Sequence, residues 1–181
     1  MDLAALRTLP TGDQQVYLLG RICTEALDME ARLRIARMRL LRTDDPEELK
    51  RGDWQFSKLT AECSRLAAGR NDLPEGIKAA FAADVSRASE LYDRRNRFMH
   101  DVLQNDMASD GWELIPISGG KRRQRSSVSF DDMVELVEAM VTTTWRLLAA
   151  ERYFQEPDEE WEEFLHAPVV GRWDGSCGWT S

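Results

Sequence analysis

Apolar residues recur at helical spacing along most of the chain. The first run places them three or four positions apart from Val16 to Leu40 and predicts a helix over 13–42. Similar runs predict a second helical segment over 46–68, a third helix over 74–104 and a fourth over 130–154. Four main helices therefore account for most of the sequence.

Residues that favour helix ends divide these runs. Asp45-Pro46 ends the first run, because proline disfavours helical backbone in the residue before it. Asp53 is expected to cap the second half of the next segment, and Pro74 suits the first turn of the third helix. Ser129 suits the N-cap of the fourth.

Between the third and fourth helices the pattern changes from helical spacing to alternation. Trp112, Glu113 and Leu114 alternate between apolar and polar, residues 118–120 form a turn sequence, and a polar, basic segment follows over 121–128. This pattern predicts a small exposed β-hairpin, in which Pro116 restricts pairing to a sheet edge. The predicted fold class is therefore all-α: an up-and-down helical bundle of four main helices with a small β-hairpin between helices 3 and 4.

Acidic residues are concentrated near the C-terminal end. The chain has 24 basic and 32 acidic residues, so its net charge is −8. Seven acidic residues and one basic residue, Arg172, lie in 155–181, which leaves the rest of the chain close to neutral. We expect a helical domain over 1–154 and an acidic, Trp-containing tail over 155–181 with one short helix over 159–165. The near-neutral domain is compatible with a phosphate-bearing ligand.

The composition argues against several classes of protein. No stretch approaches the roughly 20 apolar residues of a membrane-spanning helix, and the first residues lack the pattern of a secretory signal. Cys23, Cys63 and Cys177 lie far apart and form no CxxC pair, which is typical of reduced thiols. His166 has no second ligand at metal spacing. We expect a cytoplasmic protein with no membrane contact, no metal and no other cofactor.

One charged residue interrupts the apolar face of the third helix. The apolar positions continue in phase from Ile77 to Leu91, and the next in-phase position is Arg95. A guanidinium directed at a core is costly unless it is paired or lines a cavity. Asn96 and His100, which lie one helical turn apart, accompany it near the end of the helix.

These residue types suffice for metal-free cleavage of RNA. A base removes the proton of a ribose 2′-OH, the oxygen attacks the adjacent phosphorus, and an arginine offsets the growing negative charge. A histidine has an unperturbed pKa of about 6.5 and can therefore move protons near neutral pH. The alternative interpretation is that Arg95 forms a salt bridge with Asp93 or Glu90, and that His100 is a cation at a helix end. The pattern leaves both interpretations open.

The segment from Arg95 to His100, RNRFMH, resembles the RX4–6H motif of the HEPN superfamily in its spacing and in the polar residue after the arginine. HEPN proteins are small α-helical bundles with this motif late in a long helix. Many are metal-independent endoribonucleases of toxin–antitoxin, phage-defence and RNA-processing systems. The resemblance covers roughly residues 74–154. It implies that Arg95 contacts the phosphate, that Asn96 is the supporting polar residue and that His100 is the catalytic residue.

The spacing of the motif raises a geometric difficulty. Side chains five positions apart, such as those of Arg95 and His100, point about 140° from each other on an ideal helix. A two-fold axis near the motif would bring a second copy of both residues to one cleft. We therefore expect a homodimer through the third helix, as is common among HEPN proteins, and the resemblance implies a cognate antitoxin as a further partner.

Other basic residues are candidates for contacts with an RNA backbone. They are Arg94 and Arg97 in the third helix, and Lys121, Arg122, Arg123 and Arg125 after the turn. A solvated loop is the alternative for the second group. Trp112 beside it either anchors the hairpin or stacks on a base. The acidic run over 156–163 either forms a solvated helix or covers the basic site by mimicking nucleic acid.

The predicted function is a metal-independent HEPN-type endoribonuclease, a bacterial toxin or phage-defence component that leaves 2′,3′-cyclic phosphate ends. The alternative is a non-catalytic helical module that binds RNA or another protein. Nucleotide binding at the same cleft is a further interpretation.

Overall fold

The computed structural model describes residues 2–50, 55–106, 111–116 and 125–166, and most of them are helical. The helices are α1 (Leu3–Arg7), α2 (Thr11–Leu41), α3 (Glu47–Lys50), α4 (Phe56–Ala68), α5 (Glu75–His100), α6 (Phe130–Gln155) and α7 (Glu159–His166). A small antiparallel sheet contains β1 (Val102–Asp106), β2 (Gly111–Ile115) and β3 (Ser126–Val128) in the order β1-β2-β3.

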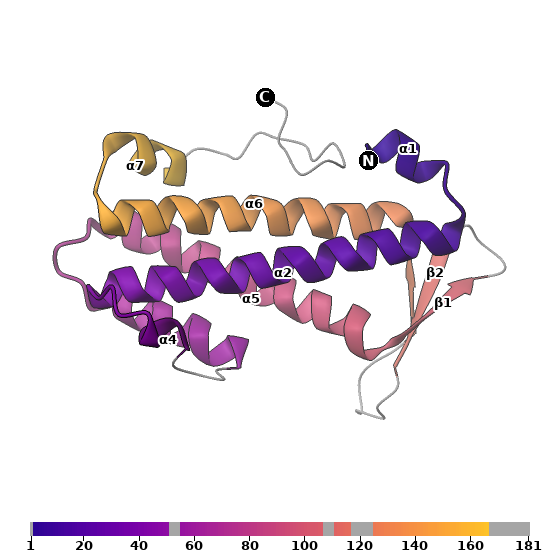
Figure 1. The fold of residues 1–181 in the computed structure, drawn as a ribbon, viewed down its shortest axis with the longest axis horizontal. Coiled ribbons are helices and arrows are strands. Elements are labelled where there is room, and N and C mark those ends of the chain that lie inside the picture. The colour runs from indigo at the N-terminus through magenta and orange to yellow at the C-terminus, as the bar shows by residue number, and fades with distance from the viewer. Residues whose placement is uncertain (1, 51–54, 107–110, 117–124, 167–181) are drawn as a thin grey trace.

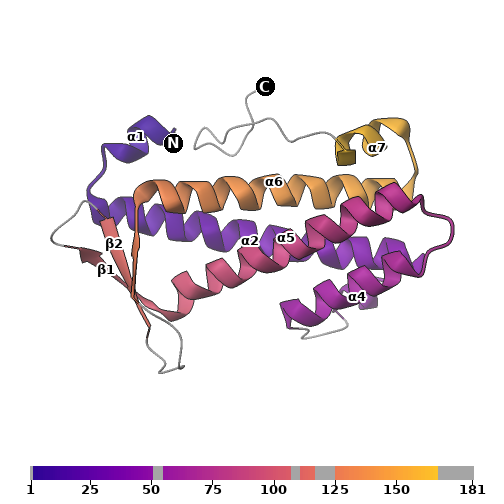
Figure 2. The same cartoon turned by 180° about the vertical axis from the view of Figure 1, so that it is seen from behind.

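The long helices pack along one another and bury a continuous core. α2 and α6 lie side by side over most of their lengths, and α5 packs against both and against α4 (Figure 1). Side chains from three of these helices are fully buried in the same cluster, including Met29 of α2, Phe81 of α5 and Leu136 of α6. The sheet lies at the C-terminal end of α5 (Figure 2). The predicted mostly helical fold is confirmed to this extent.

α6 begins as the sequence predicts. The backbone N–H of Asp132 donates to Oγ of Ser129 at 3.1 Å, and the backbone N–H of Ser129 donates to the carboxylate of Asp132 at 2.7 Å. This reciprocal capping box satisfies two backbone donors that the first turn of a helix leaves unpaired. The start of α6 is therefore fixed by a cap within its own sequence.

The expectation that the third helix continues to residue 104 is wrong. α5 ends at His100, Asp101 adopts extended backbone, and the next five residues form β1. Each residue of β1 pairs with one of β2, from Val102 opposite Ile115 to Asp106 opposite Gly111. Pairing with a segment further along the chain therefore overrides the helical pattern of 102–104.

The predicted hairpin is present as the antiparallel pair β2–β3, in which Trp112 lies opposite Val128, but its strand β2 is neither exposed nor at a sheet edge. The sheet has three strands, and β2 is its central strand. Pro116 follows the last residue of β2, so its missing N–H is not required by the ladder. Trp112 and Leu114 of β2 are buried, at 0% and 2% exposure, and pack into the helical core. The predicted turn at 118–120 and the predicted cap Asp53 lie outside the described residues.

The N-terminal half of α2 turns a different face to the core from the one predicted. Val16, expected in the apolar stripe, is 71% exposed, whereas Leu18 is fully buried. Leu18 lies four positions before Ile22 and therefore shares its face, and Val16 does not. An apolar residue is left on the outside of α2.

α7 packs at the end of the molecule opposite the sheet (Figures 1 and 2). Its Leu165 is 1% exposed and joins the core cluster formed by the other helices. Arg146 of α6 donates from Nη2 to the carbonyl oxygen of Leu165 at 2.7 Å. The described part of the acidic run therefore lies at the far end of the molecule from the C-terminus of α5.

Candidate functional site

The motif residues occupy the last turns of α5, where the helix meets the sheet (Figure 2). Arg95 and Asn96 are half-buried, and His100, the last helical residue, is exposed. Because α5 remains helical through His100, the side chains of Arg95 and His100 leave the helix about 140° apart. One protomer therefore does not direct both at a single phosphate group.

Arg95 is oriented by an amide and an aromatic ring. Its Nη1 donates to Oδ1 of Asn96 at 3.0 Å, and its Cζ lies 5.5 Å from the centre of the Tyr92 ring. Tyr92 in turn stacks on Phe56 of α4, with ring centroids 3.9 Å apart. Cation–π contact of this kind holds a guanidinium without neutralising it.

Arg95 contacts no carboxylate within the part of the chain that the structure describes. The expected alternative, a salt bridge to Glu90 or Asp93, is not formed: no ion pair joins Arg95 to either residue, and Glu90 binds Arg87 at 3.2 Å. The Nε of Arg95 is buried and has no acceptor among the described residues. The positive charge of Arg95 is therefore uncompensated by the residues around it.

His100 projects into solvent. Among residues whose placement the structure gives, none forms a hydrogen bond or ion pair with its imidazole. Asn96 lies one turn before it on the same side of α5. The imidazole is thus accessible to a ligand, and the interpretation of His100 as a helix-end cation stays open.

Arg94 and Arg97, both predicted to bind RNA, are already engaged by neighbouring elements. Nη1 of Arg94 lies 3.6 Å from a carboxylate oxygen of Glu135 in α6. Nη2 of Arg97 donates to Oγ of Ser126 in β3 at 2.8 Å, and its Nε lies 4.0 Å from Asp101. Both arginines line a surface pocket of about 200 Å³ between α5, β3 and the start of α6. The two side chains join α5 to these elements, and their charges are partly compensated.

The second predicted basic group is only partly described. Arg125 is exposed and lies 3.9 Å from Glu113. Lys121, Arg122 and Arg123 lie outside the described residues. Trp112 is fully buried, so it anchors the sheet and offers no ring for a base to stack on.

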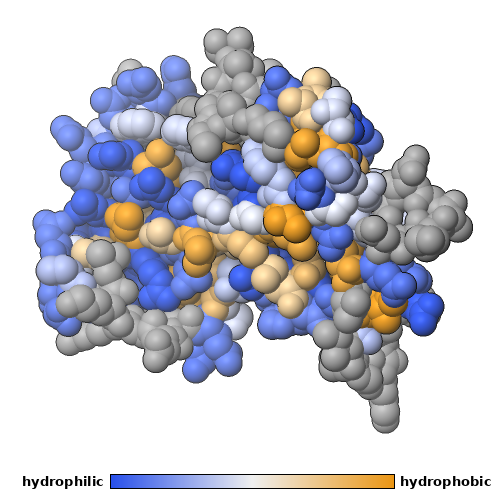
Figure 3. Space-filling model, turned by 45° about the vertical axis from the view of Figure 1, so that its right-hand side comes forward, coloured by the Kyte–Doolittle hydropathy of each residue, from blue (hydrophilic) through white to orange (hydrophobic). Residues whose placement is uncertain are grey.

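An apolar surface lies beside the motif and was missed by the sequence reasoning. Val16 and Leu27 of α2 are 71% and 65% exposed, and Met99 of α5 is 43% exposed. Cys23, which shares a face of α2 with Val16 and Leu27, contacts Met99 with a sulfur–sulfur distance of 3.3 Å. Figure 3 shows apolar surface running across the face that includes α2. We call these four residues the α2–α5 apolar surface. A sign of it was present in the sequence, because Val16 lies on a different face of the helix from Ile22.

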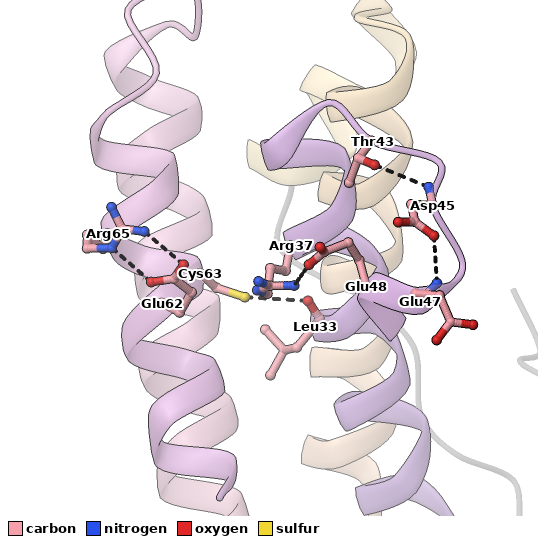
Figure 4. Close-up of polar contacts among 9 residues, drawn as sticks. All are labelled: Leu33, Arg37, Thr43, Asp45, Glu47, Glu48, Glu62, Cys63 and Arg65. Carbon is pink, nitrogen blue, oxygen red and sulfur yellow. Dashed lines mark hydrogen bonds and ion pairs between the residues drawn. The ribbon is translucent and has the colours of Figure 1, made fainter. Parts of the chain in front are cut away.

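Other polar clusters hold helices together. Arg37 of α2, 9% exposed, binds Glu48 of α3 at 3.0 Å (Figure 4). The Cys63 thiol of α4 donates to the carbonyl oxygen of Leu33 at 3.4 Å (Figure 4). Burial raises the pKa of Cys63 to about 12, so this thiol is no nucleophile at neutral pH.

The described residues offer no metal centre. Within those ranges, no group of three or more His, Cys, Asp or Glu residues is arranged to hold a metal ion. Nor does any helix in the described parts of the chain have the length and apolarity needed to cross a membrane.

Comparison of the chain with protein-family models, curated proteins and solved structures finds no match.

Proposed function

We propose that the chain is a metal-independent endoribonuclease of the HEPN type, acting as a toxin or phage-defence component, with a four-helix, up-and-down HEPN bundle as its framework. Arg95 would contact the scissile phosphate, Asn96 would orient Arg95, and His100 would transfer the proton. RNA is the substrate class, because only a ribose carries the 2′-OH that replaces a metal-activated water.

The observation that carries the proposal is the uncompensated charge of Arg95. It lies on the same helix end as an exposed histidine, and it has no carboxylate partner among the described residues. A half-buried arginine without a counterion is costly in a structural role, whereas it suits a phosphate site. Its neighbours Arg94 and Arg97 do have partners, which makes Arg95 the exception on α5.

The proposed reaction replaces the bond between phosphorus and the 5′-oxygen by a bond between phosphorus and the 2′-oxygen. The imidazole of His100 takes the 2′-OH proton, and the 2′-oxygen forms a bond to phosphorus while the bond to the 5′-oxygen breaks. The guanidinium of Arg95 stabilises the negative charge on the non-bridging oxygens. The products are a 2′,3′-cyclic phosphate and a 5′-hydroxyl, and the 5′-oxygen receives its proton from an acid, for which a second copy of His100 is the candidate.

A homodimer is part of the proposal. Two copies that meet beside α5 would place Arg95 of one copy near His100 of the other, which removes the angular difficulty within one helix. The α2–α5 apolar surface supports this, because Val16, Leu27 and Met99 expose apolar area next to the motif. A cognate antitoxin is a further proposed partner.

The test is cleavage of RNA in the presence of EDTA, with the ends of the products analysed by mass spectrometry. Wild-type protein is expected to leave 2′,3′-cyclic phosphates. His100→Ala and Arg95→Ala are each expected to lower the rate at least about a hundredfold, the usual contribution of a general acid or base or of a charge-stabilising group. Circular dichroism checks that both variants keep their helical content.

Arg87→Ala is the matched control. Arg87 lies on α5 and is paired with Glu90, so its loss removes an arginine of the same helix without touching the motif. Cleavage that requires a divalent metal, or that persists in the His100→Ala variant, would refute the proposed mechanism.

A second candidate is a non-catalytic module that binds RNA or a protein. The observation in its favour is the angle between Arg95 and His100, which one protomer leaves pointing apart. In that case the Arg95→Ala variant would lose binding, while wild-type protein would leave RNA intact at any concentration.

A further inference from the structure

A second cluster of arginines surrounds a cavity at the opposite end of the molecule from the motif. The cavity holds about 480 Å³ and lies where α2 and α6 end, beside the turn between α4 and α5. Arg39, Arg42 and Arg70 line it, together with Asp44 and Asp72. Glu156 and Asp158 flank the cavity residue Pro157 in sequence but are absent from the lining. The lining therefore has one more positive than negative charge.

Arg70 has a structural role in this cluster. Its Nε and Nη2 donate to the two carboxylate oxygens of Asp72, each at 2.6 Å, and its Nη1 donates to the carbonyl oxygen of Leu40 at 3.2 Å. Arg70 thereby caps the C-terminus of α2, and its bonds hold the pKa of Asp72 below its usual range. Arg70 thus binds both carboxylate oxygens of Asp72.

Arg39 and Arg42 are held far less firmly. Arg39 binds Asp44, whose side chain is 86% exposed. Arg42 shares with Arg70 a single carboxylate oxygen of Asp72, at 2.7 Å, and is itself 68% exposed. Arg39 itself is 26% exposed, but an ion pair with one partner this exposed contributes little to stability, so a competing anion displaces the carboxylate at low cost.

The backbone of Arg42 gives an independent reason to regard its side chain as functional. Arg42 has φ 56° and ψ 44°, and it is the non-glycine residue with positive φ in the described chain. It ends α2 in a Schellman motif, with the N–H of Thr43 donating to Met38 and its own N–H to Arg39. Glycine occupies this position at lower cost, and residues kept in such strain cluster at ligand sites.

We propose that this arginine pocket binds a small ligand of the diphosphate class. Guanidinium groups match phosphate oxygens in planar, two-point contacts. Arg39 and Arg42 each bind a different carboxylate, so a ligand that displaces both must bring two adjacent anionic groups. The volume of the cavity lies within the range of small-molecule sites and accommodates a nucleoside diphosphate.

Calorimetric titration of the full chain with pyrophosphate and with ADP tests the proposal. Both are expected to bind saturably, with a dissociation constant of about 1 mM or below, and to raise the melting temperature. Succinate offers four acceptor oxygens where pyrophosphate offers six, and a flexible two-carbon chain joins its carboxylates, so it is expected to bind at least about tenfold more weakly. Equal binding of succinate, or no saturable binding of either phosphate probe, would overturn the assignment.

Arg42→Gly separates binding from folding. Glycine favours the left-handed backbone, so the variant is expected to melt at or above the wild-type temperature while its affinity for pyrophosphate falls at least roughly tenfold. Arg39→Gln is expected to weaken binding similarly. Arg65→Ala removes an arginine of comparable exposure, 66%, from the side of α4 and serves as the control.

Arg95→Ala shows which end of the molecule binds the probe. It is expected to bind pyrophosphate as wild-type protein does, and loss of binding would place the probe at the motif and overturn the proposal. Unchanged affinity in the Arg42→Gly variant would do the same. The ribonuclease proposal is unaffected by either result, because its test is the cleavage of RNA.

Discussion

Replacing Arg146 by methionine would leave a buried carboxylate without its partner. Asp84 of α5 is 6% exposed, and its Oδ1 accepts from Nε of Arg146 at 2.5 Å. Its other oxygen, Oδ2, is buried and has no partner among the described residues. Methionine retains the apolar stem of arginine but offers no donor, so Asp84 would have to remain charged and unpaired or take up a proton.

The expected cost at pH 7 is large. Removing one partner of a buried ion pair typically lowers the free energy of unfolding by about 3–5 kcal/mol. Since 1 kcal/mol shifts the melting temperature of a chain of this length by about 2–4 °C, the variant is expected to melt about 6–20 °C lower. Arg146 also binds the carbonyl oxygen of Leu165, so amide hydrogen exchange in α7 is expected to accelerate.

The direction in which the stability deficit of the variant changes with pH follows from the pKa of Asp84. Burial raises the pKa of Asp84, and Arg146 opposes that shift, so in the variant the pKa of Asp84 rises further. An acid whose pKa is higher in the folded state binds more protons there than in the unfolded state. Its protonated form therefore favours folding at low pH, and that stability is lost as pH rises through the folded pKa. The deficit of the variant relative to wild type is expected to shrink on acidification.

The assay is urea unfolding of wild type and variant at pH 7 and over a series of lower pH values, because the pKa of Asp84 is raised by burial. Asp84→Asn combined with Arg146→Met is expected to be more stable at pH 7 than Arg146→Met alone, because no charge is left buried. Arg152→Met, on the same helix but exposed, is the control and should leave stability nearly unchanged. A deficit that stays constant or grows on acidification would refute the reasoning.

Three further predictions rest on separate features. Ser129→Ala breaks the capping box of α6 and is expected to lower the free energy of unfolding by about 1 kcal/mol, measured by urea unfolding. The double variant Val16→Asp, Leu27→Asp puts charges on the α2–α5 apolar surface. It is expected to shift the proposed dimer to monomer in analytical ultracentrifugation, with helical content unchanged. A wild-type sedimentation profile would count against this surface as the interface. The Cys63 thiol, with its pKa raised to about 12, is expected to resist a thiol reagent at pH 8 until the protein is unfolded in urea, and rapid labelling of Cys63 in native protein would contradict the burial described.

The sequence predicts those parts of the fold that depend on local chemistry. α6 is the clearest case, since its apolar spacing and the Ser129 cap lie within the helix itself. β1 is the opposite case. Residues 102–104 continue the helical pattern of α5, and only pairing with β2, a segment further along the chain, turns them into a strand. The buried face of α2 is a case of phase and not of distant pairing, since Leu18 shares the face of Ile22 and Val16 does not.

The residues of the candidate site were chosen from the sequence, but the groups that bind each arginine were not predicted. The sequence singles out Arg95 from Arg94 and Arg97 by its phase on the third helix, but it does not show which of the three has a partner, because the groups that approach them come from α6 and the sheet. In the structure Glu135 approaches Arg94, and Ser126 and Asp101 approach Arg97, whereas Arg95 meets an amide and an aromatic ring. The difference follows from direction around α5: the two paired arginines face α6 and β3, and Arg95 faces Tyr92.

The two ends of the molecule therefore differ in whether their arginines are paired with carboxylates, more than in the number of arginines. In the arginine pocket, Arg39 binds Asp44 and Arg42 binds Asp72. A ligand that binds both arginines must compete with these two carboxylates, so it needs two anionic groups. At the motif Arg95 has no carboxylate to give up among the described residues, so a single phosphodiester charge suffices. Under the two proposals, a chain of phosphodiesters binds at the motif and a compact diphosphate binds in the pocket. If both proposals hold, salt should weaken RNA binding at the motif without abolishing the preference of the pocket for pyrophosphate over succinate, because screening acts on charge and leaves the two-point geometry in place.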